Sequence, residues 1–193
     1  MSADGPFRRW VRRSRVRSPW LVHFDCGGCN GCDIEVLDML TPRYSAERLG
    51  VVNVGDPRQA DVLVVTGPAN PRNAEVLRAV YDQMLEPKVV VAAGSCAAHG
   101  GIFRGASNVL GGVGEVVPVD VFVPGCPPPP WRILAGIIDA VPLLADVRPP
   151  RSPSGGPSRP EPLRVVPDDR PAKGQVDPAI DAHDADPESV TDP

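Results

Sequence analysis

The sequence predicts an α/β domain built on an open parallel β-sheet, and three features support this prediction. Short runs rich in valine and leucine alternate with stretches whose apolar residues recur at helical spacing. The runs at 61–67 and 88–94 are apolar almost throughout, which is typical of strands buried on both faces of a sheet. Strands that alternate with helices at these lengths pair in parallel through right-handed crossovers. We therefore expect about four parallel strands with flanking helices.

The expected elements follow one another between residues 20 and 145. Strands are predicted at 20–25, 51–54, 61–67, 88–94 and 119–125, and helices at 33–40, 73–85 and 128–144. The helix faces predicted to be apolar comprise Ile34, Leu37 and Leu40 in the first helix and Val76, Leu77, Val80 and Met84 in the second. Asn73 is the expected N-cap of the second helix. The third helix begins at prolines, which the first helical turn tolerates.

The two ends of the chain differ from this middle in composition. Residues 1–19 form a basic extension with six arginines and a single acidic residue, which suits an anionic membrane surface or an acidic partner subunit. No apolar run follows Arg8 and Arg9, so we expect neither a twin-arginine export signal nor a membrane-spanning segment. Residues 146–193 hold 11 of the 25 prolines, ten acidic residues and no aromatic one, and we expect this acidic tail to be disordered.

Five cysteines form the most distinctive pattern in the chain. Cys26, Cys29 and Cys32 follow the first expected strand, while Cys96 and Cys126 each follow a later one. Because strand-to-helix loops of a parallel sheet lie at one edge, the fold brings these distant thiols together. Four thiolates around one centre suit an iron–sulfur cluster or a tetrahedral zinc ion. Neighbouring glycines let the backbone approach a cluster and donate N–H bonds to its sulfides.

Other uses of the cysteines fit the pattern less well. Zinc usually takes its ligands as close C-x-x-C pairs, and a redox dithiol would leave Cys96 and Cys126 without a role. A nucleophilic Cys96 with His99 as its base lacks an orienting acid, and no phosphate-binding G-x-x-x-x-G-K-[ST] motif occurs. Neither is there a nucleic-acid-binding pattern. Spacing alone does not decide which two of Cys26, Cys29 and Cys32 would be ligands.

Five blocks of sequence, in this order, carry a resemblance to a known family: CNGCDIE, TPRYSAERLG, ADVLVVTG, GSCAAHGGIF and VPVDVFVPGCPPPP. Together they resemble the small electron-transfer subunit of energy-converting [NiFe]-hydrogenases, a family that includes the small subunit of formate hydrogenlyase. This family is related to the 20-kDa subunit of respiratory complex I, an NADH-quinone oxidoreductase. The resemblance covers about residues 20–145. The Cys-Asn-Gly-Cys spacing, where complex I has adjacent cysteines, favours the hydrogenase side.

The resemblance implies a flavodoxin-like domain that binds one [4Fe–4S] cluster through Cys29, Cys32, Cys96 and Cys126, with Cys26 as the spare thiol. It implies electron relay between a ferredoxin-like subunit and a large subunit that carries the nickel–iron site. The complex would be attached to a membrane arm on the cytoplasmic side. Two alternatives stay open: a complex-I-like quinone oxidoreductase without hydrogen chemistry, and a zinc-stabilised adaptor without redox function.

Four further residues are expected near this centre. Glu35 matches an acidic residue close to the family's cluster, where it would assist proton movement or accept a helix N-terminal N–H. Arg43 matches a position near the quinone or active-site junction of relatives, and a salt bridge with Asp38 or Glu47 is an equally good interpretation. His99 and His23 are expected around the centre or in the core, not as ligands.

Overall fold

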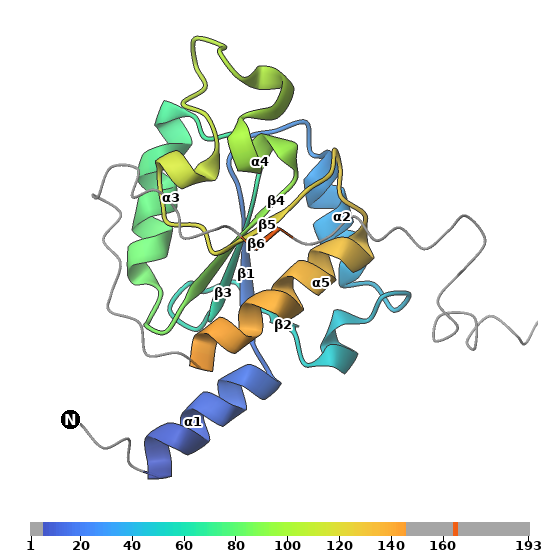
Figure 1. Ribbon diagram of the computed structural model, residues 1–193, viewed down its shortest axis with the longest axis vertical. Helices are drawn as coiled ribbons and strands as arrows, with labels where there is room; N and C mark the ends of the chain where they lie inside the picture. The colour runs from blue at the N-terminus through green and yellow to red at the C-terminus, as the bar shows by residue number, and fades with distance from the viewer. Residues whose placement is uncertain (1–5, 146–163, 166–193) are drawn as a thin grey trace, which may run out of the picture.

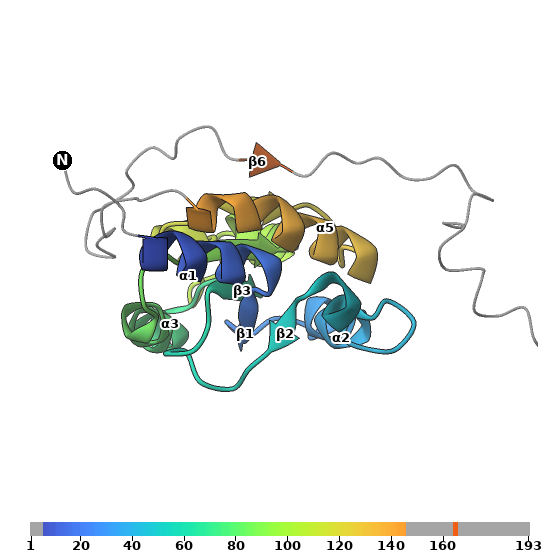
Figure 2. The same ribbon diagram turned by 90° about the horizontal axis from the view of Figure 1, so that it is seen from below.

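The computed structural model describes residues 6–145 and 164–165 of the 193-residue chain. Within them, one parallel sheet lies between two layers of helices (Figures 1 and 2). The strands are β1 (Trp20–Asp25), β2 (Val52–Asn53), β3 (Val62–Thr66), β4 (Val89–Ala93), β5 (Val121–Val123) and β6 (Arg164–Val165). The helices are α1 (Pro6–Arg17), α2 (Gly31–Met39), α3 (Pro71–Gln83), α4 (Ser95–His99) and α5 (Pro130–Ala140). Short 3-10 helices are η1 (Ala46–Leu49), η2 (Gly101–Phe103), η3 (Val113–Glu115) and η4 (Val141–Ala145).

The strand order is β2-β1-β3-β4-β5-β6, and every neighbouring pair among the described residues is parallel. Apart from β6, this is the flavodoxin-like order, in which the chain leaves β1 for one edge and then returns to its other side. The predicted α/β fold is therefore confirmed. The described residues contain more strands than the four expected, because the weak run at 51–54 does pair with β1 and residues 164–165 extend the sheet beyond β5.

Two apolar cores cover the two faces of the sheet. One lies under α2 and α5, and the other lies under α3 and α4. All residues of β3 and β4 are buried, as their continuous apolar sequence predicts. Successive residues of these strands alternate between the two cores: Val62 and Val64 belong to the first, and Leu63 and Val65 to the second.

Helix α2 is rotated relative to the expectation. Ile34 and Leu37 are more than half exposed, whereas Val36 and Met39 are buried against the sheet. The sequence offers two apolar stripes at helical spacing, and Asp33 decides between them, since its carboxylate accepts a hydrogen bond from Thr66 on β3. Val36 lies one turn further along that face. The predicted inward face of α2 was therefore wrong.

Helix α3 departs from the expectation in two details. Val76 is half exposed, and the buried face is formed by Ala74, Leu77 and Tyr81. The N-cap is Asn70, whose side chain accepts from the N–H of Asn73, so the predicted cap at Asn73 was three residues too late. Pro71 occupies the first helical position, which its fixed backbone suits.

The basic extension contains a helix, α1, that the sequence did not reveal. It packs against η4 at the end of the sheet opposite α4 (Figure 1). Arg15 joins it to the domain through an ion pair with Asp61, at 3.3 Å. In residues 6–145 no helix has both the length and the apolar character needed to cross a membrane. The predicted disordered tail falls outside the described residues, except for Arg164 and Val165.

Candidate metal centre

Three segments at the carboxyl edge of the sheet carry the predicted ligands: Cys29 lies in the loop after β1 and Cys32 at the start of α2, Cys96 lies in α4, and Cys126 lies in the loop after β5. The cysteine loop (residues 26–30) joins β1 to α2, Gly94 joins β4 to α4, and a third loop follows β5. Backbone hydrogen bonds tie the second loop to the third: Gly94 N–H donates to the carbonyl of Val123 and Ser95 N–H donates to that of Gly125, both at 2.8 Å. Cys96 and Cys126 are thereby held on adjoining segments, as the topology predicts.

Four of the five thiols influence one another electrostatically. Burial is the largest cause that raises the pKa of Cys32 to about 12, followed by Asp33 and then by Cys96, Cys29 and Cys126. The pKa of Cys96 is raised by burial and then by Cys126 and Cys29, against a backbone N–H bond from Ile102. Without a bound cation, the raised pKa values disfavour the thiolates of Cys32 and Cys96. A positively charged inorganic centre would favour the thiolates by the same interactions.

Cys26 stands apart from this group. It is fully buried and packs in the core beneath α3 and α4. Burial and then the charge of Asp25 raise its pKa to about 12, and no other cysteine contributes. By contrast, Cys29 and Cys126 are exposed, and all five cysteines are free of disulfides. Cys29, Cys32, Cys96 and Cys126 thus lie on neighbouring segments at the carboxyl edge, and Cys26 lies in the core.

Glycines keep space clear around two of these sulfurs, and at a third an added Cβ would make an ordinary contact. A Cβ on Gly94 would lie 2.5 Å from the sulfur of Cys32, and one on Gly101 would lie 2.7 Å from that of Cys96. A Cβ on Gly31 would lie 3.5 Å from the sulfur of Cys29. The thiol donor set and this glycine-lined surround fit an iron–sulfur cluster, whose sulfides need close backbone approach.

No three Cys, His, Asp or Glu side chains in the described parts of the chain have the spacing to hold one metal ion. The four thiolates of a [4Fe–4S] cluster each bind a different iron, so they stand further apart than the ligands of a single ion.

Polar residues that the sequence did not single out hold the cysteine loop and the start of α2. Asp25 Oδ1 accepts the N–H groups of Gly27, at 2.7 Å, and Gly28, at 3.3 Å. The hydroxyl of Thr66 donates to Asp33 at 2.5 Å. The order Asp-Cys-Gly-Gly is a recognisable turn signal for the first contact, whereas no sequence signal links Thr66 to Asp33.

The four further residues have different surroundings. His23 lies on β1, with Nε2 3.0 Å from the hydroxyl of Thr66 and 3.1 Å from Asp33 Oδ1. Burial lowers the pKa of His23, against the opposing effects of Asp33 and Asp25. In the described structure Glu35 is half-buried and caps no helix. Arg43 lies 6.0 Å from the ring of Tyr44 and, within residues 6–145, forms no ion pair with Asp38 or Glu47, so that predicted salt bridge was wrong.

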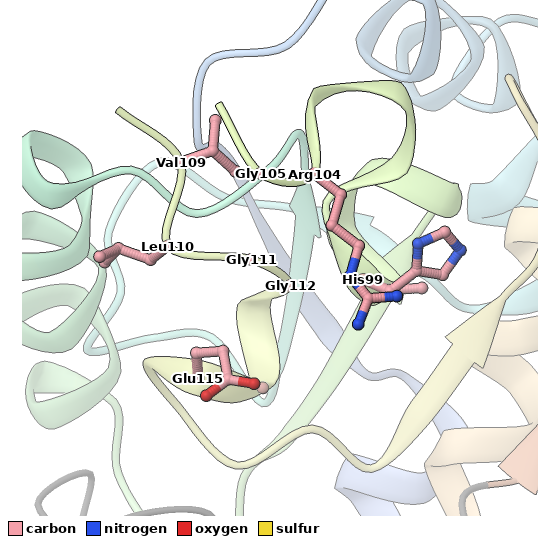
Figure 3. Close-up of a pocket in the computed structure, with 10 residues that line it drawn as sticks. His99, Arg104, Gly105, Val109, Leu110, Gly111, Gly112 and Glu115 are labelled. Carbon is pink, nitrogen blue, oxygen red and sulfur yellow. The ribbon is translucent and has the colours of Figure 1, made fainter. Parts of the chain in front are cut away.

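His99 is exposed and lines a surface pocket of about 400 Å³ formed by residues 98–115. Figure 3 shows His99 and Arg104 on one side of this pocket and Glu115 on the other, with Gly112 between them. The imidazole of His99 therefore lines a polar surface depression beside α4.

Comparison with known proteins agrees with the fold and identifies a family. Residues 29–140 match the family described as NADH ubiquinone oxidoreductase, 20 Kd subunit. The probable membrane-bound hydrogenase subunit mbhJ of Pyrococcus furiosus is 50% identical over 129 residues, which are 67% of this chain and 77% of that protein. A subunit of the NADH-quinone oxidoreductase of Desulfovibrio desulfuricans is 45% identical over 69% of this chain and 71% of its own length.

Two further similarities widen the range of complexes. Formate hydrogenlyase subunit 7 of Escherichia coli is 41% identical over 66% of this chain, and the match spans half of that longer protein. A chain in the structure of the membrane-bound sulfane sulfur reductase, an archaeal respiratory membrane complex, superposes with a TM-score of 0.62 at 32% identity and covers 72% of this chain and 77% of that one. These relatives are subunits of oxidoreductase complexes. The chain therefore belongs to the family of the NADH ubiquinone oxidoreductase 20 Kd subunit.

Proposed function

We propose that this chain binds one [4Fe–4S] cluster through Cys29, Cys32, Cys96 and Cys126. The observation that carries the proposal is that the segments bearing these four thiols meet at one sheet edge. A Cβ on Gly94, two residues before Cys96, would lie 2.5 Å from the sulfur of Cys32, and Gly94 and Ser95 are hydrogen-bonded to Val123 and Gly125, just before Cys126. When bound, such a cluster accepts and releases one electron without a proton or bond rearrangement in the protein. The chain's own residues supply four thiolates, clearance at Gly94 and Gly101, and an N–H bond from Ile102 to Cys96.

We further propose that the chain relays electrons to or from the active site of a large partner subunit in a membrane-associated [NiFe]-hydrogenase-type complex. Two observations support a partner at the carboxyl edge. Cys29 and Cys126 are exposed, so a bound cluster would face the surface. Ile34, Leu37 and Ile102 are 63%, 61% and 84% exposed next to the segments that carry the thiols, and apolar side chains of this kind are commonly covered by a partner.

The complex-I-like alternative requires the same cluster and differs in the partner's chemistry. The relatives support both versions, because they include hydrogenase subunits and a quinone oxidoreductase subunit. A ferredoxin-like iron–sulfur subunit and a membrane-arm subunit are the other partners we propose. The expected position is peripheral, on the cytoplasmic side of the membrane.

Metal and sulfide analysis of the anaerobically purified chain tests the cluster. We expect about four iron and four sulfide per chain, as one [4Fe–4S] cluster contains. One zinc without sulfide would instead support the zinc-stabilised adaptor, and the relay would then be rejected. To separate the two cluster-bearing alternatives, the complex is isolated through a tag on this chain. Nickel in the co-purified large subunit supports the hydrogenase version, and its absence supports the quinone version.

Serine substitutions test the ligand set. We expect Cys29→Ser, Cys32→Ser, Cys96→Ser and Cys126→Ser each to abolish the electron paramagnetic resonance signal of the reduced cluster. Cys26→Ser is the matched control and should keep the signal, because Cys26 is fully buried beneath α3 and α4 and has no electrostatic influence from the other thiols. Retention of the signal in Cys32→Ser together with its loss in Cys26→Ser would show that the other C-x-x-C pair binds the cluster.

A further inference from the structure

The backbone carbonyl of Cys26 accepts two side-chain donors from the start of α3. Asn70 Nδ2 donates to it at 2.6 Å and Asn73 Nδ2 donates at 2.8 Å. The N–H of Cys26 in turn donates to the carbonyl of Thr66 at 2.9 Å, which continues the pairing of β1 with β3. The residue at which β1 ends and the cysteine loop begins is therefore held through both of its backbone polar groups.

Asn70 performs two tasks with one amide group. Its Oδ1 caps α3 by accepting the N–H of Asn73 at 2.9 Å. Because a backbone N–H requires an acceptor, this contact fixes the orientation of the amide and directs Nδ2 to the carbonyl of Cys26. The same side chain thereby links the beginning of helix α3 to the loop that carries Cys29.

The segment around Asn70 also contacts the region of Cys96. Ala69 pairs with Gly111, through N–H bonds from Ala69 to the Gly111 carbonyl at 3.0 Å and from Leu110 to the Ala69 carbonyl at 2.8 Å. Gly112 in turn packs closely on the carbonyl of Ala98 in α4, and a Cβ added to Gly112 would overlap that carbonyl oxygen. Residues 69–73 thus contact the cysteine loop on one side and residues 110–111, next to the glycine that packs on α4, on the other.

The cysteine loop needs restraint from outside. Gly27 has a φ of +95°, and Gly28 and Gly31 follow within four residues. Glycine loses more conformational freedom on ordering than any other residue, so a loop of this composition has little intrinsic rigidity. Its position must come from contacts, and the asparagine donors and Asp25 are the polar side chains that contact residues 26–28 in the described structure.

We propose that Asn70 and Asn73 are positioning residues. They set the placement of the cysteine loop, which carries Cys29 and leads into α2, relative to α4, which carries Cys96. The hydrogen bonds at the Cys26 carbonyl hold the cysteine loop against the start of α3. The Ala69–Gly111 pairing holds residues 69–73 against the segment whose Gly112 packs on α4. This inference rests on the proposed function in one respect, namely that the positioned thiols bind a [4Fe–4S] cluster. Neither asparagine is a cluster ligand.

Two substitutions separate this positioning from ordinary helix capping. Asn70→Asp keeps an oxygen that can cap α3 but replaces the amide donor with a carboxylate. Asn73→Ala removes the second side-chain donor, while the backbone N–H of residue 73 can still donate to the capping oxygen of Asn70. Asn108→Asp is the matched control, since Asn108 is an exposed asparagine on the loop after η2 and has no hydrogen bond in the described structure.

The readout is the reactivity of Cys26, which is fully buried. The full-length chain is isolated anaerobically and treated with N-ethylmaleimide, and the modification rate of Cys26 is found by mass spectrometry relative to the same thiol in denaturant. Loss of one hydrogen bond predicts about a fivefold faster modification in either variant, and a larger increase in the double variant. The amide exchange of α3 should stay unchanged in Asn70→Asp, because the cap remains, and the line shape of the reduced cluster's resonance signal should change.

Three results would overturn the inference: a Cys26 rate equal to that of the wild type in both variants, an equal increase in Asn108→Asp, or an increase accompanied by lost protection of α3. The last would mean that a broken cap opens the region. If the wild-type chain contains no iron and sulfide, the proposed function fails, yet the maleimide comparison still decides whether the asparagines hold the loop. If the cluster is present and the rates do not differ, only the positioning inference fails.

Discussion

Gly94 shows how strongly one residue can be constrained at the carboxyl edge. Its φ of +93° lies where a side chain is strained, and an added Cβ would lie 2.5 Å from the sulfur of Cys32. The two constraints are independent, because the first concerns the backbone of residue 94 and the second concerns a thiol from another loop. A substitution here should therefore affect both folding and the proposed centre.

We expect Gly94→Ala to lower the free energy of unfolding by about 2–3 kcal/mol, since a non-glycine residue in such a conformation costs about 1–3 kcal/mol and the sulfur must also move. Iron bound per chain should fall with it. Gly114→Ala is the matched control, because nothing lies within 4 Å of its Cβ and its φ is not positive. Urea unfolding and iron analysis of both variants check this, and equal results for the two would contradict it.

The position of Cys26 was open to prediction from the strand that precedes it. Val22 and Phe24 face the core beneath α3, and the alternation of a strand carries Cys26 to the same face. Sequence spacing alone left either C-x-x-C pair as the ligands, whereas this alternation favours Cys29 and Cys32. The roles of Thr66 and Asn70 could not be predicted in this way, because their contacts join residues 33 and 44 positions apart.

At the scale of elements, α1 is attached to the domain by a half-buried ion pair. Asp61 is 7% exposed, and its carboxylate accepts a hydrogen bond from the N–H of Trp20 at 3.1 Å and lies 3.3 Å from Arg15. Burial raises the pKa of Asp61 above its ordinary 3.8, against the lowering effects of Trp20 and Arg15. The site thus disfavours the charged form of this carboxyl group, and the arginine of α1 reduces that penalty.

This gives Arg15→Gln a pH-dependent effect. A raised native pKa favours the protonated carboxyl, so the stability that Asp61 contributes is full below pH 3.8 and is lost as pH rises through the native pKa. Without Arg15 the native pKa rises further and the loss continues to higher pH. At pH 7 we expect the variant to be about 1–2 kcal/mol less stable than the wild type, with a smaller difference at pH 4.

Urea unfolding at several pH values measures this effect. Arg13→Gln is the control, because Arg13 is an exposed arginine of the same helix. In an Asp61→Asn background, the change in the free energy of unfolding caused by Arg15→Gln should no longer depend on pH. A difference that stays constant from pH 4 to pH 8 would show that Arg15 acts through its bond to the Glu86 carbonyl or through packing.

The helices also show the limit of sequence periodicity. Leu77 and Met84 were correctly placed inside, but Ile34, Leu37 and Val76 were not. In α2 the apolar residues occupy both sides of the helix, so the pattern does not specify a face. The face is chosen by the contact of Asp33 with Thr66 on β3, which is a tertiary interaction.

At the scale of the whole molecule, the parallel topology accounts for the proposed centre. The parallel sheet, which the alternating strands and helices predicted, brings the ends of β1, β4 and β5 to one edge, and the segments after these ends carry all five cysteines. The basic helix α1 lies at the opposite end of the sheet (Figure 1). Contacts of α1 with a membrane or a membrane-arm subunit would therefore leave the cysteine edge free for a large subunit.

The same topology predicts that the chain can be shortened after residue 145. Both apolar cores lie between Leu21 and Leu144, and the match to the family ends at residue 140. Beyond residue 145 the described structure contains only β6, which pairs with Val121 and Phe122 at the edge of the sheet. Removing residues 146–193 therefore removes no part of either core and none of the five cysteines.

We expect the chain truncated after residue 145 to keep its iron and sulfide content and a thermal midpoint within a few degrees of the full chain. Amide exchange should become faster in β5, because that strand loses its outer neighbour. Removal of residues 1–17 is the informative contrast, since it removes Arg15 and leaves the buried Asp61 without its cation. That truncation should lower the thermal midpoint more, although it deletes fewer residues. Loss of the cluster on removal of the tail would show that residues beyond 145 contribute to the centre at the carboxyl edge.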